Sequence, residues 1–128
     1  MRQWLQNSWH MAWLISAEIK TKMTKALSQK NFKKQVIESA ALSLVQFKAE
    51  WNGTCQIIAP LFKSLAVTYK RKVKFFTVDV EENKSLETEH GVTGIPTILF
   101  FKNGKMIDHL AGLAPRNIII EKIENALA

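Results

Sequence analysis

This chain of 128 residues has little cysteine, proline or glycine: one Cys, three Pro and five Gly. The only thiol, Cys55, excludes an intramolecular disulfide, and with three scattered histidines it forms no metal-ligand spacing. We therefore expect no cofactor and no metal, and we expect a reducing compartment, the cytoplasm. The longest mostly apolar N-terminal run is too short to span a bilayer: MAWLISA.

The composition is that of one globular domain, with 47% hydrophobic residues and seven Phe. The formal charge of +7 suggests nucleic acid or an acidic membrane surface as candidate partners. The densest basic run, Tyr69 to Lys74, precedes an apolar strand pattern and is typical of a helix C-terminus. We expect neither nucleic acid nor a membrane to be the main partner.

Residues 1–22 form an N-terminal extension that holds three of the four Trp residues. Apolar residues recur at helical spacing from Leu5 to Leu27, so an amphipathic helix is one interpretation. A poor signal peptide and a segment not native to the folded domain are the other two, and the last is favoured. Met23 is a candidate start, and the sequence predicts a folded domain over residues 23–128.

The elements alternate along that domain. We predict helices that begin near Ser28, Gly53, Asn83 and Pro115, buried strands over Ala41–Phe47 and Val73–Val80, and a hairpin that turns at Asn103-Gly104. Pro60 is expected to kink the second helix. A crossover pair of parallel strands followed by a hairpin predicts an α/β fold, with a mixed central sheet and helices on both faces.

Four stretches carry a resemblance to a known family: LVQFKAEWNGTCQIIAP, KFFTVDVEEN, GVTGIPTILFFKNGK and GLAPRNIIIEKIENALA. With these in order from about Met23 to Ala128, the chain resembles thioredoxin. The resemblance implies the thioredoxin fold, with a redox loop at the start of the helix that contains Pro60. It also implies a role in cell redox homeostasis as a protein-disulfide oxidoreductase.

The loop departs from the family's Trp-Cys-Gly-Pro-Cys pattern, because it reads Trp51-Asn52-Gly53-Thr54-Cys55. The exposed nucleophilic cysteine of the family is Asn52 here, and the resolving thiol is Cys55. An amide cannot attack a disulfide, so two-thiol turnover is predicted to be lost. Asn52 itself is expected to cap the following helix. Cys55 is expected to be a small buried thiol, with a reactive single cysteine as the alternative.

Two further departures bear on the same chemistry. By the resemblance, Gln46 replaces a buried aspartate that accepts the proton of the resolving thiol, and Thr77 replaces a lysine on the neighbouring strand. The matching groove residues are present: Trp51, Gly53, Thr54, the cis-proline loop Gly94-Ile95-Pro96, and Gly112. The resemblance implies that the residue before a cis-proline pairs its backbone with an extended peptide.

Two hypotheses for function follow. The favoured one is a binding module whose groove holds an extended segment of a partner protein without redox turnover. The alternative is a single-cysteine thiol–disulfide oxidoreductase that uses Cys55, with a thioredoxin reductase-like partner. Membrane-surface attachment through residues 1–22 is a weaker third hypothesis. His90 and His109 are expected to be surface or loop residues without chemistry.

Overall fold

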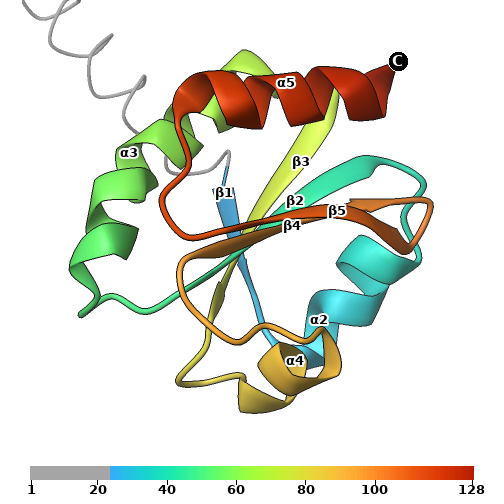
Figure 1. Ribbon diagram of the computed structural model, residues 1–128. Coiled ribbons are helices and arrows are strands. Elements are labelled where there is room, and N and C mark those ends of the chain that lie inside the picture. Colours follow the sequence, from blue (N-terminus) through green and yellow to red (C-terminus); the bar gives the residue numbers. More distant parts are fainter. Residues whose placement is uncertain (1–23) are drawn as a thin grey trace, which may run out of the picture.

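The computed structural model describes residues 24–128. A five-stranded sheet forms its centre, in the order β1-β3-β2-β4-β5 (Figure 1). The strands are β1 (Thr24–Leu27), β2 (Leu42–Lys48), β3 (Val73–Asp79), β4 (Thr97–Lys102) and β5 (Lys105–Ala111). The first three are parallel, and β4 and β5 are antiparallel to their neighbours. The predicted mixed α/β sheet is confirmed.

Helices cover both faces of this sheet (Figure 1). One face carries α3 (Gly53–Thr68) and α5 (Arg116–Leu127). The other carries α2 (Gln29–Phe32), the π-helix η1 (Lys33–Ile37) and α4 (Lys84–Glu89). Pro60 lies inside α3, which continues to Thr68.

Each face of the sheet has its own apolar core. Leu44 and Phe100 point to the side of α3 and α5, where they pack with Phe62 and Ile119. Val45 points to the opposite side, because successive side chains of a strand alternate between faces. Six consecutive residues of β2, 42–47, are buried, as expected for a central strand covered on both sides.

The first element differs from the predicted order. Residues 24–27 form a parallel edge strand on β3, with Leu27 beside Val78, whereas the sequence prediction began with a helix. Leu27 is therefore not part of a helix with the preceding apolar residues. The helix considered for residues 1–22 lies outside the described residues. The next prediction is confirmed, since Ser28 caps α2 and its N–H donates to Asn31 Oδ1 at 2.8 Å.

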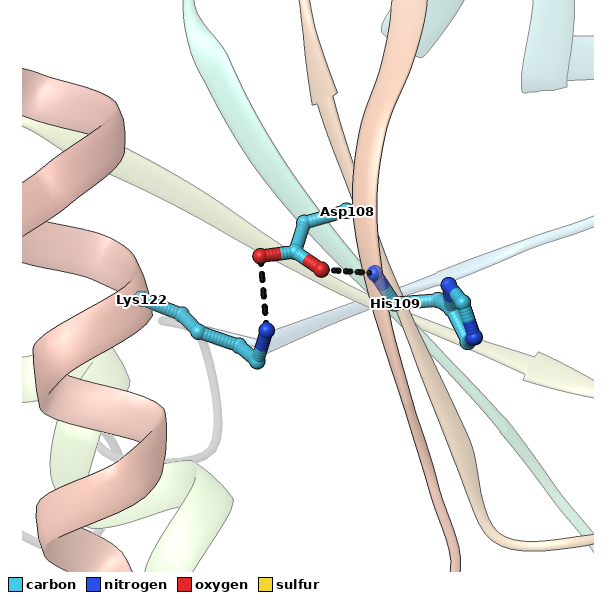
Figure 2. Close-up of polar contacts among 3 residues, drawn as sticks. All are labelled: Asp108, His109 and Lys122. Atoms are coloured by element: carbon cyan, nitrogen blue, oxygen red, sulfur yellow. Dashed lines mark hydrogen bonds and ion pairs between the residues drawn. The ribbon is translucent and has the colours of Figure 1, made fainter.

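The hairpin between β4 and β5 turns as the sequence predicts. Asn103 and Gly104 both have positive φ, 53° and 75°, the conformation that a two-residue hairpin turn requires. On β5 of this hairpin, Asp108 Oδ2 accepts a hydrogen bond from Lys122 Nζ of α5 at 2.8 Å, and Asp108 Oδ1 accepts one from the N–H of His109 (Figure 2). Partial burial acts to raise the pKa of Asp108, but these two hydrogen bonds outweigh it and hold the pKa below its usual value.

Asp108→Asn is expected to lower the free energy of unfolding by about 0.5 kcal/mol at neutral pH, since the Asp108 side chain is 38% exposed and solvent screens the pair. A lowered pKa stabilises the fold above the unfolded-state pKa, and that contribution is lost as the pH falls through the folded-state pKa. The difference between wild type and variant should therefore vanish in acid. Urea titrations at neutral and acidic pH check this, and a difference that is the same at both would contradict it.

Candidate functional site

The candidate site begins where β2 ends. Trp51 follows this strand and is 66% exposed, and its indole Nε1–H donates to Glu81 Oε1. Glu81 comes after β3, which runs parallel to β2 at its side. The carboxyl ends of the two strands therefore bring together residues 30 positions apart. This contact fixes the indole at the edge of the sheet.

Asn52 is the N-cap of α3. Its side-chain Oδ1 accepts a hydrogen bond from the backbone N–H of Cys55 at 3.0 Å, and its backbone is extended, with φ −82° and ψ 121°. The side chain thus satisfies one of the N–H groups that a helix leaves open at its first turn. The predicted capping role is confirmed.

Cys55 lies in the first turn of α3 and is 3% exposed. The prediction of a small buried thiol is confirmed. Burial in apolar surroundings denies a substrate disulfide access to the sulfur. The sulfur of the single cysteine in the sequence is therefore not at the surface.

Gln46 and Thr77 occupy paired positions of β2 and β3. Gln46 is 1% exposed, and its Nε2 has no hydrogen-bond partner among residues 24–128. Because Gln46 is two residues from Leu44 on the same strand, it points to the side of α3 and α5. An amide there offers no base at neutral pH, so the pair Gln46–Thr77 cannot move the proton of a thiol.

Gln46→Leu is expected to leave the protein as stable as wild type or to stabilise it by up to about 2 kcal/mol. The reason is that a buried donor without a partner costs its desolvation free energy, and leucine of similar size removes that donor. Denaturant midpoints measure the effect. Ser43→Ala is a matched control, because the buried Ser43 Oγ also lacks a partner among the described residues. A clear destabilisation by Gln46→Leu would mean that the amide is bonded.

The second side of the site is the loop before β4. The Ile95–Pro96 peptide bond is cis, and Gly112, with φ 80°, donates its N–H to the carbonyl oxygen of Pro96 at 2.7 Å. Thr97 Oγ1 donates to the Gly94 carbonyl at 2.6 Å. No hydrogen bond in residues 24–128 uses the backbone N–H or C=O of Ile95. The loop therefore presents one unused backbone donor and one unused backbone acceptor, both at Ile95.

The two sides of the site leave the sheet at the same edge. Phe47 near the end of β2 pairs with Thr97 at the start of β4, so the loop with Trp51 and the loop with Ile95 are neighbours. Gly53 and Thr54 open α3 between them; Gly53 is exposed and Thr54 half-buried. The sequence-predicted groove residues thus surround one edge, whereas Gln46 and Cys55 lie beneath it.

Sequence reasoning missed two features of this region. No spacing signal links Trp51 to Glu81, since their contact depends on the parallel pairing of β2 and β3.

His90 is half-buried and contacts the rings of Phe32, Phe47 and Phe101, with Nδ1 2.9 Å from the Leu86 carbonyl. His109 is exposed on β5. Both histidines line a cleft next to Gly112, which the sequence did not indicate.

Comparison with known proteins agrees with this arrangement. The family model for thioredoxin matches residues 23–125. The chain belongs to the thioredoxin family. It is 35% identical to thioredoxin of Rickettsia felis over 105 residues, and this match covers 82% of this chain and all of that protein. It is 37% identical over 102 residues to the chloroplastic thioredoxin M-type of Chlamydomonas reinhardtii, covering 80% of this chain and 73% of that one.

A solved structure shows the same fold. The crystal structure of Malassezia sympodialis thioredoxin superposes with a TM-score of 0.75 at 34% identity, over 82% of this chain and 91% of that one. Within this thioredoxin fold, residues 24–128 contain no group of three metal-ligating side chains. Among the same residues, no helix has the length and apolar character to cross a bilayer.

Proposed function

We propose that this thioredoxin-family protein acts in redox homeostasis as a binding module rather than as a disulfide reductase. Its groove would hold an extended segment of a partner protein, in a cytoplasmic setting. One observation carries the proposal: the residue at the start of α3 is Asn52, whose amide caps the helix, while the only cysteine is 3% exposed.

The chemistry of disulfide exchange supports this choice. Exchange needs a thiolate that attacks one sulfur of the substrate, and a second thiol that then releases the reduced product. The nitrogen lone pair of the Asn52 amide is delocalised, and it forms no stable bond to sulfur. Cys55 lacks both surface access and a partner thiol. Two-thiol turnover is therefore not expected.

The surface beside Asn52 supports peptide binding. Trp51, Ile57 and Leu113 are large apolar side chains that remain more than half exposed. An aromatic side chain such as Trp51 commonly carries much of the free energy of a protein interface once a partner covers it. The unused N–H and C=O of Ile95 can add main-chain hydrogen bonds to an extended segment, as in strand addition.

Binding by the groove is expected to depend on Trp51 and not on Cys55. We suggest a selection of displayed random peptides on the wild-type protein, followed by calorimetric titration of the selected peptides. Trp51→Ala should raise the dissociation constants of these peptides by about tenfold or more, because it removes the exposed indole. Cys55→Ser, a buried near-isosteric change, should have little effect.

Opposite outcomes would overturn this proposal. If no peptide is enriched, or if Cys55→Ser abolishes binding as strongly as Trp51→Ala, the groove is not a redox-independent binding site. Thermal unfolding followed by circular dichroism shows whether each variant retains the fold.

The second candidate is a single-cysteine oxidoreductase, favoured by the position of Cys55 in the first turn of α3. Here the Cys55 thiolate would attack a disulfide, form a mixed disulfide and release one thiol, and an external thiol or a thioredoxin reductase-like partner would restore it. Incubation with glutathione disulfide tests this. Mass addition at Cys55 in the native protein supports the second candidate, and addition only in denaturant refutes it.

A further inference from the structure

A cleft of about 440 Å³ lies beside the groove, between the loop 90–95 and the sheet. Leu99 of β4 and His109 of β5 are paired across the two strands, and Met106 lies further along β5 on the same face. All three line the cleft. The core of this face covers Leu99, which is buried, whereas Met106 and His109 remain exposed. The cleft is therefore open to solvent over β5.

The cleft and the groove share part of their walls. Gly94, Ile95 and Gly112, which belong to the groove, also line the cleft. An extended segment that bonds to the backbone N–H and C=O of Ile95 would thus reach the cleft with a residue a few positions away. The inference below rests on the proposed function and identifies a feature of the partner segment.

The lining of the cleft selects the chemistry of its occupant. It contains no Asp, Glu, Lys or Arg. Two of its polar groups are already engaged, because Thr97 Oγ1 donates to Gly94 and His90 Nδ1 contacts the Leu86 carbonyl. A charged side chain would lose hydration there without gaining an opposite charge. Apart from the neutral hydroxyl of Thr93, the remaining side chains are apolar groups, a thioether and imidazole rings.

We infer that the cleft takes an aromatic side chain of the partner segment that the groove binds. A ring can make sulfur–aromatic contact with Met106 and ring contact with His109. The volume is large enough for any single aromatic side chain. The partner is therefore an extended segment with an aromatic residue at a fixed distance from the residue that pairs with Ile95.

Two neighbouring residues of β5 provide a matched test. Met106 and Ile107 are both 48% exposed, but only Met106 lines the cleft. The probes are synthetic peptides, selected for binding that depends on Trp51, and the same peptides with each aromatic residue replaced by alanine. Met106→Glu should weaken binding of the parent peptides by about tenfold, and Ile107→Glu by less than about twofold.

The peptide and protein changes should also be coupled. Replacing the aromatic residue should cost about tenfold on wild type and much less on Met106→Glu, because the two changes remove the same contact. Equal effects of Met106→Glu and Ile107→Glu, or independent effects of the two changes, would overturn the inference while leaving Trp51-dependent binding intact. A lack of any Trp51-dependent peptide would instead overturn the proposed function. Met106→Ala serves as a second variant if the charged one unfolds.

Discussion

Asn52→Cys is expected to give the protein disulfide reductase activity, with a rate at least on the order of 10³ above the wild-type background. The new thiol would lie at the N-cap of α3, next to the exposed Trp51. Two residues, Gly53 and Thr54, would separate it from Cys55. A helix N-terminus lowers the pKa of such a thiol and so supplies the attacking thiolate. Cys55 would then act as the resolving thiol. A reductant-coupled assay with a protein disulfide substrate measures the gain.

Controls separate the two thiols and the proton acceptor. Asn52→Ser keeps a capping side chain without sulfur and should remain inactive. Asn52→Cys combined with Cys55→Ser should accumulate a mixed disulfide without turnover, since no second thiol releases the product. Adding Gln46→Asp to Asn52→Cys should raise the rate further by supplying a buried base. Wild-type turnover equal to that of Asn52→Cys would refute the proposed loss of reductase activity.

Gly104→Ala is expected to destabilise the fold by about 3 kcal/mol or more. Gly104 has φ 75°, which a residue with a Cβ adopts only with strain, and a Cβ built there would overlap the carbonyl oxygen of Ile37 at the end of η1. The dihedral angle and the Ile37 carbonyl both belong to the backbone. Neither side-chain rotation nor a small local shift therefore relieves the strain or the overlap. Urea unfolding of wild type and variant measures the loss.

Two other glycines isolate the causes. Gly91 has φ 67° but nothing within 4 Å of a built Cβ, so Gly91→Ala should cost only the backbone strain, about 1 kcal/mol. Gly53 has neither a positive φ nor a close neighbour, and Gly53→Ala should be neutral or slightly stabilising, by about 0.5 kcal/mol. If Gly104→Ala lowered the free energy of unfolding no more than Gly91→Ala does, the described close approach of the hairpin to η1 would be contradicted.

The sequence could predict those elements whose local signals agree with their burial. The apolar run of β2 indicates a strand covered on both faces, and Asn103-Gly104 fixes the hairpin. β1 carries no such signal, because it has four residues and only Leu27 among them is buried. Its strand conformation depends on hydrogen bonds to β3, where each paired residue lies 51 positions further along the chain, and no local pattern encodes them. The same holds for the close approach of Gly104 to the Ile37 carbonyl at the end of η1.

The candidate site divides along the same line. The roles of Asn52 as a cap and Cys55 as a buried thiol follow from local helix chemistry together with the family pattern. The unpartnered amide of Gln46, the contact of Trp51 with Glu81, and the cleft over β5 depend on which strands are neighbours. His90 follows α4 and His109 lies on β5, and the two line one cleft although 19 positions separate them in the sequence.

The parallel pairing of β1 has a practical consequence for attaching this domain to other molecules. Thr24 lies beside Phe75 near the start of β3, and the Ala126 carbonyl accepts from Lys102 Nζ at the end of β4. Both positions are at the opposite end of the sheet from Trp51. Fluorophores, affinity tags or surface tethers attached at Thr24 or after Ala128 would thus start at the end of the sheet away from Trp51.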